Sequence, residues 1–338
     1  MIITKITLSE HKIPLKHPFI TALRRVEAVA FVRIHIHTDT QNIGIGEAPP
    51  TKAITGETLE SISKSIRHTI TPKLLGLSPQ EALEVLKELS HNSASAAVDM
   101  ALFDLCAQDS NQTLRAYLGA ETSTLKTAIT LSLNTPELMA KQAKEALKSG
   151  LDILKVKVGG SDGKDIERIH AISTIAPHAT ILLDANQAWS KLEAFRIIES
   201  IQNLNIALIE QPVAANDLTA MAEITRMSKI PILADESAFN LKELKKVIAM
   251  NAADMINIKL MKCGGISPAR EILAYAQEHK IRCMMGSMLE GPHSIMAAAA
   301  LAMAYPETIT YIDLDSPLLY EDITLAHPLK FHKNELSL

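Results

Sequence analysis

The chain has 338 residues, of which 47% are hydrophobic but only 4% aromatic, and its formal net charge at pH 7 is −4. This length suits a large α/β barrel with an added module, and the aliphatic side chains can fill a large core. The negative charge argues against a general nucleic-acid binder, which would carry a basic stripe, so we expect no nucleic-acid partner.

The cysteines and the N-terminal stretch indicate the compartment. The three cysteines, Cys106, Cys263 and Cys283, are odd in number and widely spaced, which is typical neither of a disulfide framework nor of a zinc cluster. The first residues, MIITKITLSEHKIPLKHPF, lack the apolar core and cleavage site of a secretory signal. No apolar span reaches the roughly 20 residues of a membrane helix. These features predict a cytoplasmic protein with no membrane partner.

The first third of the chain and the remainder have different periodicities. Residues 1–47 alternate as antiparallel strands do, and residues 57–118 are mainly helical, which predicts an α+β module over 1–122. From about residue 125, strands and helices alternate strictly. Eight strands are expected: TAITLSL, ILKVKV, ATILLDA, IALIEQP, PILADES, MINIKL, IRCMMGS and TYIDLD. This alternation predicts a closed, parallel (β/α)8 TIM-type barrel over 123–316.

A polar residue stands near the C-terminal end of each expected strand, at steps of about 25 residues: Ser132, Lys157, Asp184, Glu210, Asp235, Lys259, Ser287 and Asp313. In a barrel these ends form the rim that carries the active site, so we expect the side chains to converge on one cavity. A lone polar residue at such a place often caps the next helix, as Thr135 can before Pro136. Capping does not explain the order Lys, Asp, Glu, Asp, Lys.

Three acids follow three successive strands: Asp184, Glu210 and Asp235. Three carboxylates at one rim repel one another unless a cation neutralises them. They are hard oxygen donors without a His or Cys partner, so they predict a Mg²⁺ site, with Mn²⁺ possible and Zn²⁺ disfavoured.

Two lysines, Lys155 and Lys157, lie on one face of a hydrophobic strand. A lysine that acts as a base near neutral pH needs a pKa of roughly 7 to 8, well below its reference value of about 10.4. Burial and a neighbouring positive charge both lower the pKa of an ammonium group. We therefore predict that Lys155 supports Lys157 as the base. The alternative is that one lysine only pairs with a core carboxylate.

Lys259 lies on the sixth expected strand, across the barrel from the second strand, which carries Lys157. Two bases on opposite sides of a metal-bound substrate suggest that one removes a proton from carbon and the other returns a proton to the opposite face. The metal would hold the enolate oxygens. The expected product has an inverted stereocentre.

These residues resemble the enolase superfamily in its muconate-lactonizing subgroup. The pieces LKVKVGG, LLDANQAW, LIEQP, ILADES, INIKLMKCGG and GSMLE occur in the order of that subgroup and cover essentially the whole chain. The resemblance implies that Lys157 and Lys259 are the acid/base pair and that Asp184, Glu210 and Asp235 are the Mg²⁺ ligands. It also implies that the α+β module is a capping domain. We expect the tail, residues 317–338, to pack back on it.

Within the subgroup, the chain looks most like dipeptide epimerases of the L-Ala-D/L-Glu type. PFITALRRVEAV resembles their mobile capping loop, in which Arg24 matches an arginine that meets a substrate side-chain carboxylate, and residues 48–58 resemble the second loop. In YIDLDSPL, Asp313 and Asp315 match the pair that holds the free ammonium of a dipeptide. We also expect substrate contacts from Thr135 and Ser287.

Other functions stay open on the sequence alone. An o-succinylbenzoate synthase, a cycloisomerase or an N-acylamino acid racemase would share the barrel chemistry, but their substrates have no free ammonium for Asp313 and Asp315. A non-catalytic barrel that binds a small molecule is an alternative of another class. For the dipeptide epimerase we expect a small dipeptide as the partner and a homo-oligomeric assembly.

Overall fold

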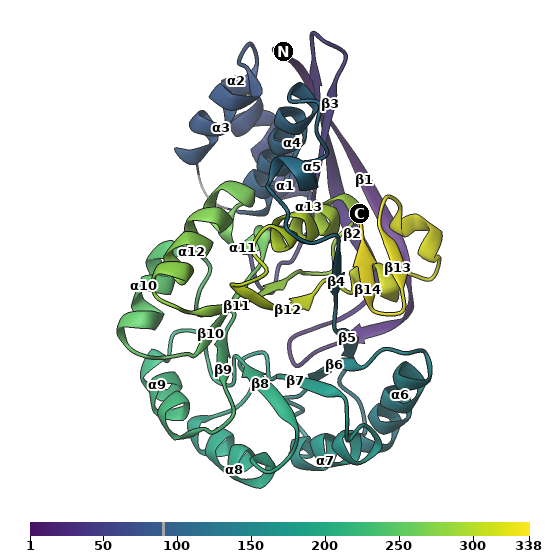
Figure 1. The fold of residues 1–338 in the computed structure, drawn as a ribbon, viewed down its shortest axis with the longest axis vertical. Helices are drawn as coiled ribbons and strands as arrows, with labels where there is room; N and C mark the ends of the chain where they lie inside the picture. Colours follow the sequence, from purple (N-terminus) through teal and green to yellow (C-terminus); the bar gives the residue numbers. More distant parts are fainter. Residues whose placement is uncertain (90–91) are drawn as a thin grey trace.

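The protein, in a computed structural model that describes residues 1–89 and 92–338, consists of a barrel and a smaller module packed against one end of it (Figure 1). The module is built from the N-terminal third of the chain. Its elements are β1 (Ile3–Ile20), β2 (Arg25–Thr38), β3 (Ile43–Ala48), α1 (Leu59–Lys64), a π-helical turn (Ser65–Ile70), α2 (Thr71–Leu74), α3 (Pro79–Lys87), α4 (Ser93–Asp109) and α5 (Leu114–Tyr117).

The three strands of the capping module form an antiparallel sheet whose inner face packs against α4. From Val32 onward β2 alternates, so that Ile34 and Ile36 are buried while His35 between them is half-buried. The approach of β3 to α4 is close, because a Cβ atom added at Gly46 would lie 1.9 Å from the carbonyl oxygen of Ala97. A glycine is therefore required at position 46 for this packing.

Eight parallel strands form the barrel in sequential order: β5 (Ile129–Leu131), β6 (Ile153–Lys157), β7 (Thr180–Asp184), β8 (Ile206–Glu210), β9 (Ile232–Ala234), β10 (Met255–Ile258), β11 (Arg282–Gly286) and β12 (Ile309–Asp313). The backbone N–H of Ala128 donates to the carbonyl of Ile312 and joins the first strand to the last. The predicted barrel is thereby confirmed. The strands end earlier than expected: Asp235, Lys259 and Ser287 each follow the last residue of their strand.

The inside of the barrel is arranged in two layers. The lower layer is apolar, and its buried members are Ala128, Leu182, Leu208, Leu233, Met255 and Met284, with Ile153 and Tyr311 packed against them. Two residues further along the strands, the same face carries charged or polar side chains, among them Lys155, Asp184 and Glu210. Because strand side chains alternate with period two, the residue two positions after each apolar residue also points into the barrel.

Four of the helices that cover the barrel, α6, α8, α9 and α10, begin at a side-chain cap. Ser190 and Glu193, for example, form a reciprocal capping box at the start of α8. The helices are α6 (Pro136–Lys148), α7 (Asp165–Ile175), α8 (Lys191–Ile201), α9 (Leu218–Met227), α10 (Leu241–Ala249), α11 (Leu260–Cys263), α12 (Ile266–Glu278) and α13 (Pro292–Met303). In the described part of the chain, no helix is long and apolar enough to cross a membrane.

The C-terminal tail contacts both parts of the molecule (Figure 1, yellow). It comprises two 3-10 turns (Ser316–Leu319 and Ile323–Ala326) and the hairpin strands β13 (Lys330–His332) and β14 (Glu335–Ser337). Glu321 N–H donates to Pro14 O in β1, and Lys16 Nζ donates to Leu318 O, 3.1 Å away. β14 pairs with β4 (Thr124–Lys126), which precedes the barrel.

Candidate active site

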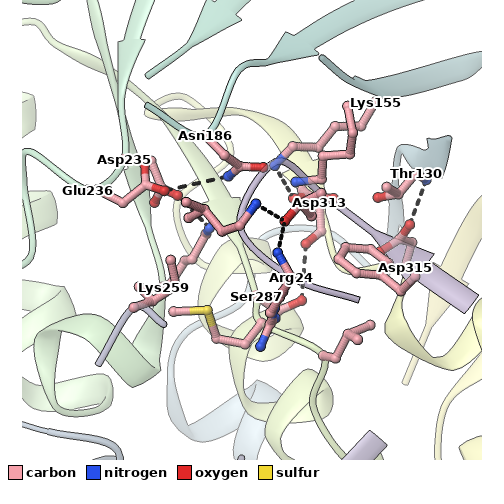
Figure 2. Close-up of a pocket in the computed structure, with 17 residues that line it drawn as sticks. Arg24, Thr130, Lys155, Asn186, Asp235, Glu236, Lys259, Ser287, Asp313 and Asp315 are labelled. Carbon is pink, nitrogen blue, oxygen red and sulfur yellow. Dashed lines mark hydrogen bonds and ion pairs between the residues drawn. The ribbon is translucent and has the colours of Figure 1, made fainter. Parts of the chain in front are cut away.

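A pocket lies at the C-terminal ends of the barrel strands, under two loops of the capping module (Figure 2). The barrel contributes Thr130, Lys155, Lys157, Asn186, Asp235, Glu236, Lys259, Ser287, Met288, Leu289, Asp313 and Asp315, and the capping module contributes Phe19, Thr21, Leu23, Arg24 and Ile54. The sequence-predicted lysines, Arg24, Ser287 and the aspartates of β12 therefore share one pocket. Asp184 and Glu210 are fully buried beneath it.

The three acids each contact a lysine. Lys157 Nζ lies 2.5 Å from Asp184 Oδ2, and Lys259 Nζ lies 2.7 Å from Asp235 Oδ2 and 4.0 Å from Glu210 Oε1. Strand register explains this proximity, because Lys157 is level with Asp184, and Asp184 with Glu210. Burial acts to raise the pKa of Asp184, but the ammonium groups of Lys157 and Lys155 outweigh it and lower that pKa.

Lys155 joins three carboxylates at the centre of the site. Its Nζ lies 2.6 Å from Asp313 Oδ2, 2.7 Å from Glu210 Oε2 and 3.3 Å from Asp184 Oδ2, and the residue is 1% exposed. Burial alone would lower the pKa of Lys155, but the nearby carboxylates raise it well above its ordinary value. Lys155 therefore stays protonated and neutralises the acids around it.

The pKa of Lys259 is shifted in the opposite direction from the one expected for a base. Burial lowers the pKa of its ammonium group, yet Asp235 and Glu210 outweigh burial and raise that pKa above its ordinary value. The expected lowering toward neutrality is therefore absent while Asp235 holds the amine. The sequence could indicate burial and neighbouring charge, but it could not indicate that each pocket lysine would contact a carboxylate directly.

Three buried polar residues that the sequence did not single out hold the acids in place. Lys262 Nζ donates to Asp235 Oδ1 at 2.6 Å, to Asp235 O at 2.7 Å and to Asn257 O at 2.8 Å. Asn257 Nδ2 donates to Glu210 Oε1 at 2.7 Å. Gln211 Oε1 accepts the backbone N–H of Asp235 at 3.0 Å. Asn257 lies in β10 two residues before Lys259, and Lys262 lies three residues after Lys259. This spacing is the signal that could have revealed them.

Two further pocket residues, Glu236 and Asn186, were also missed. Glu236 is adjacent to the predicted ligand Asp235 in the motif ADES, and Asn186 lies two residues after the predicted ligand Asp184 in the motif DAN. Burial, then the charges of Asp235 and Asp184, raise the pKa of Glu236 to about 8. Glu236 Oε2 and Asn186 Oδ1 are buried without a hydrogen-bond partner in the described structure, so they remain available to a bound molecule.

The donor set of Asp184, Glu210 and Asp235 fits a hard divalent cation. All three are buried carboxylates from successive strand ends, and burial together with the Asp184 charge raises the pKa of Glu210 to about 7. Such mutual repulsion is relieved by an ion that favours oxygen ligands, as Mg²⁺ does. Among the described residues, no three His, Cys, Asp or Glu side chains converge closely enough to hold a metal as they stand, because the lysines engage these oxygens.

Arg24 is presented by the turn between β1 and β2. Thr21 shapes this turn, since its Oγ1 accepts the N–H groups of Leu23 and Arg24 at 3.1 and 3.3 Å. Burial lowers the pKa of Arg24, and no carboxylate of the described residues lies within ion-pair distance of it. Its neighbour Arg25 is instead exposed and pairs with Glu27 at 3.1 Å. Arg24 is therefore a pocket cation that lacks a protein partner.

Asp313 and Asp315 both line the pocket at the end of β12. Asp315 Oδ2 accepts the backbone N–H of Thr130 at 2.6 Å, and burial, followed by the Asp313 charge, raises its pKa to about 6. Ser287 Oγ donates to the Asp313 carbonyl at 3.3 Å. The two carboxylates thus share one side of the pocket, as their spacing predicts.

Thr135 and Ser132 are not part of this pocket. Thr135 is exposed and caps α6, where its hydroxyl accepts the N–H of Leu138. Ser132 Oγ accepts the N–H of Ile20 at 3.2 Å and so ties β1 to the barrel. Thr130, five residues before Thr135, is the threonine of this strand region that reaches the pocket, and the sequence gave no reason to choose it.

Comparison with known proteins matches both parts of the chain. Residues 3–119 match the mandelate racemase/muconate lactonizing enzyme N-terminal domain, and residues 138–338 match the enolase C-terminal domain-like family. The chain belongs to the mandelate racemase/muconate lactonizing enzyme family of the enolase superfamily. The sequence-based resemblance is thereby confirmed.

Curated relatives and solved structures are similar over nearly the whole chain. An L-amino acid-D/L-Glu epimerase of Sulfurimonas denitrificans is 48% identical over 96% of this chain and 95% of its own. A substrate-liganded L-Ala-D/L-Glu epimerase of Bacillus subtilis superposes with a TM-score of 0.96 at 39% identity, covering 100% of this chain and 96% of that one. A dipeptide epimerase of Enterococcus faecalis, complexed with Mg and L-Leu-L-Tyr, gives 0.93 at 35% identity, covering 100% and 97%.

The Lys262 contacts generate a stability prediction. Lys262→Met keeps most of the side-chain volume but removes the donor that Lys262 provides to buried oxygens of Asp235 and Asn257. We therefore expect the free energy of unfolding, measured in urea, to fall by about 3 to 5 kcal/mol. Lys191→Met is the matched control, because Lys191 pairs with Glu223 at 3.0 Å on the surface. The free energy of unfolding of Lys191→Met should fall by less than about 1 kcal/mol. Equal losses would show that Lys262 does not hold the acids.

Proposed function

We propose that this protein is a Mg²⁺-dependent dipeptide epimerase that inverts the α-carbon of the C-terminal residue of a dipeptide. The observation that carries this proposal is the placement of Lys157 and Lys259. β6 and β10 lie four strands apart in either direction around the ring, and both lysines face the same pocket beside the predicted metal ligands. Two amines on opposite sides of one substrate suit proton removal from one face and delivery to the other.

The proton transfer requires one lysine as base and the other as acid. Nζ of the basic lysine takes the α-proton, the substrate carboxylate becomes an enolate, and the other ammonium group returns a proton to the opposite face. A divalent cation held by Asp184, Glu210 and Asp235 would stabilise charge on the enolate oxygens and draw those acids away from the lysines. Lys155 remains protonated in both directions and adds positive charge beside the enolate.

The two ends of the pocket have complementary charges for a dipeptide. Asp313 and Asp315 provide anions for the free ammonium of the first residue. Arg24, which lacks a protein carboxylate partner, provides two-point contact for a glutamate side chain at the second position. We therefore propose the L-Ala-D/L-Glu type of substrate. Thr135 does not line the pocket and its hydroxyl caps α6, so we propose Thr130, which does line the pocket, in its place.

The alternatives are less well supported by these contacts. Substrates of an o-succinylbenzoate synthase, a cycloisomerase or an N-acylamino acid racemase have no free ammonium to place beside Asp313 and Asp315. A non-catalytic barrel has no use for three buried acids whose repulsion must be neutralised. Self-association into a homo-oligomer and a cytoplasmic location stay predictions.

The function is tested by exchange of the substrate α-proton in deuterated solvent. With Mg²⁺, the wild-type protein should exchange and epimerise L-Ala-L-Glu, and chelation of the metal should abolish both. Lys157→Ala and Lys259→Ala should each lose epimerisation, measured by chiral chromatography, while keeping the fold by circular dichroism. Each should still exchange the proton of the one epimer that faces its remaining lysine.

Two outcomes would contradict this assignment. Epimerisation that survives in either lysine variant would remove the two-base mechanism. Exchange of N-succinylated amino acids with a kcat/KM above that of every dipeptide would favour the N-acylamino acid racemase instead.

The specificity of the second position is tested with the adjacent arginines. Arg24→Ala should lower kcat/KM for L-Ala-L-Glu by about 10- to 100-fold, because a charge-assisted bidentate contact contributes about 1.5 to 3 kcal/mol. The loss for L-Ala-L-Leu should be several times smaller. Arg25→Ala, whose side chain pairs with Glu27 outside the pocket, is the matched control and should leave both values unchanged. Equal losses for both dipeptides would reduce Arg24 to a general loop contact.

A further inference from the structure

A buried carboxylate of the capping module is bonded to the barrel loop that follows Lys259. Asp99 lies in α4 and is 2% exposed. Its Oδ1 accepts the backbone N–H groups of Ile266, at 2.5 Å, and Ser267, at 3.2 Å, at the start of α12. These two groups belong to the N-terminal turn of a 13-residue helix, where backbone donors have no partner within the helix. Asp99 therefore fixes the start of α12 to the capping module.

The segment between Lys259 and Ile266 is short and internally bonded, so it can transmit this attachment. The Lys259 carbonyl accepts the N–H of Lys262 at 2.9 Å, and the Leu260 carbonyl accepts the N–H of Gly265 at 3.0 Å. A Cβ atom at Gly265 would lie 2.5 Å from Asp99 Oδ1. The loop is therefore compact, and glycine at position 265 permits the contact with Asp99.

The loop that follows Lys157 is held in a comparable way, but from within the barrel. Asp165 accepts the N–H of Gly159 at 2.7 Å and that of Gly160 at 3.2 Å. It also accepts Trp189 Nε1 at 2.8 Å and pairs with Arg168 at 3.1 Å. The partners of Asp165 in these contacts all belong to the barrel, whereas Asp99 comes from the capping module itself.

We propose that Asp99 is a positioning residue for Lys259 alone, so that attachment of the capping module controls the half of the proton transfer in which Lys259 acts. Asp165 is the corresponding positioning residue for Lys157. The proposal rests on the two-lysine epimerase function. Its physical reason is that proton transfer depends steeply on placement, since a displacement of about 1 Å at a reacting group can cost on the order of 100-fold in rate. Loss of either carboxylate should therefore disturb one base more than the other.

The experiment measures α-proton exchange separately for the two epimers of one dipeptide. Epimerisation requires both lysines and cannot separate them, but exchange requires only the lysine that faces the proton. Lys157→Ala and Lys259→Ala identify which epimer faces which lysine. Asp99→Ala should then slow exchange of the Lys259-facing epimer by about 10-fold or more relative to the other epimer. Asp165→Ala is the matched control and should slow exchange of the Lys157-facing epimer more than that of the other epimer.

Two measurements separate positioning from general damage. Asp99→Asn keeps an oxygen acceptor for Ile266 and Ser267, so it should restore most of the exchange that Asp99→Ala loses. Backbone hydrogen exchange by mass spectrometry should show faster exchange over residues 264–268 in Asp99→Ala but not in Asp165→Ala. If Asp99→Ala does not fold, Gly265→Ala, which pushes the loop away from Asp99, should give the same epimer bias.

The possible failures are distinguishable. A wild-type protein that exchanges no dipeptide would overturn the proposed function and this proposal with it. Wild-type exchange together with equal losses for both epimers in the folded Asp99→Ala or Gly265→Ala variant would overturn the positioning role alone.

Discussion

The site depends on the mutual neutralisation of buried charges at the mouth of the barrel. Four ammonium groups, those of Lys155, Lys157, Lys259 and Lys262, contact four carboxylates, those of Asp184, Glu210, Asp235 and Asp313. An isolated charge at such burial would cost several kcal/mol or neutralise itself. Because each of these four lysines has an acid within hydrogen-bond distance, their ammonium groups can remain charged inside the protein. In the proposed mechanism the same set would supply both the metal ligands and the bases.

The apolar layer beneath these charges makes the arrangement possible. Residues such as Leu182 and Leu208 fill the barrel interior and exclude water from below, and each lies two residues before a buried acid on the same strand face. A one-residue shift of register would turn the acid toward the covering helices. The chemistry of the rim is therefore fixed by the packing of the layer below it.

Strand-end residues could be predicted from the sequence because the βα repeat and the side-chain alternation determine their place. This explains why the sequence could place Lys157, Asp235, Lys259 and Asp313 at one pocket. Contacts that depend on side-chain direction could not be predicted. Thr135 was chosen as a substrate contact, but its hydroxyl caps a helix, and Thr130 reaches the pocket instead. The raised pKa of Lys259 could not be predicted for the same reason. It depends on a 2.7 Å contact with Asp235 that residue spacing does not reveal.

These contacts also bear on how two protonated lysines would serve as bases in the proposed reaction. While Asp235 holds Lys259, the ammonium form is favoured, and the amine cannot accept a proton near neutral pH. In the proposed mechanism, a cation bound to Asp184, Glu210 and Asp235 would offset the negative charge around Lys259 and so lower its pKa. Formation of the base would then be coupled to occupation of the acid cluster. Such pairing would avoid a neutral buried amine and would restrict proton abstraction to the assembled complex.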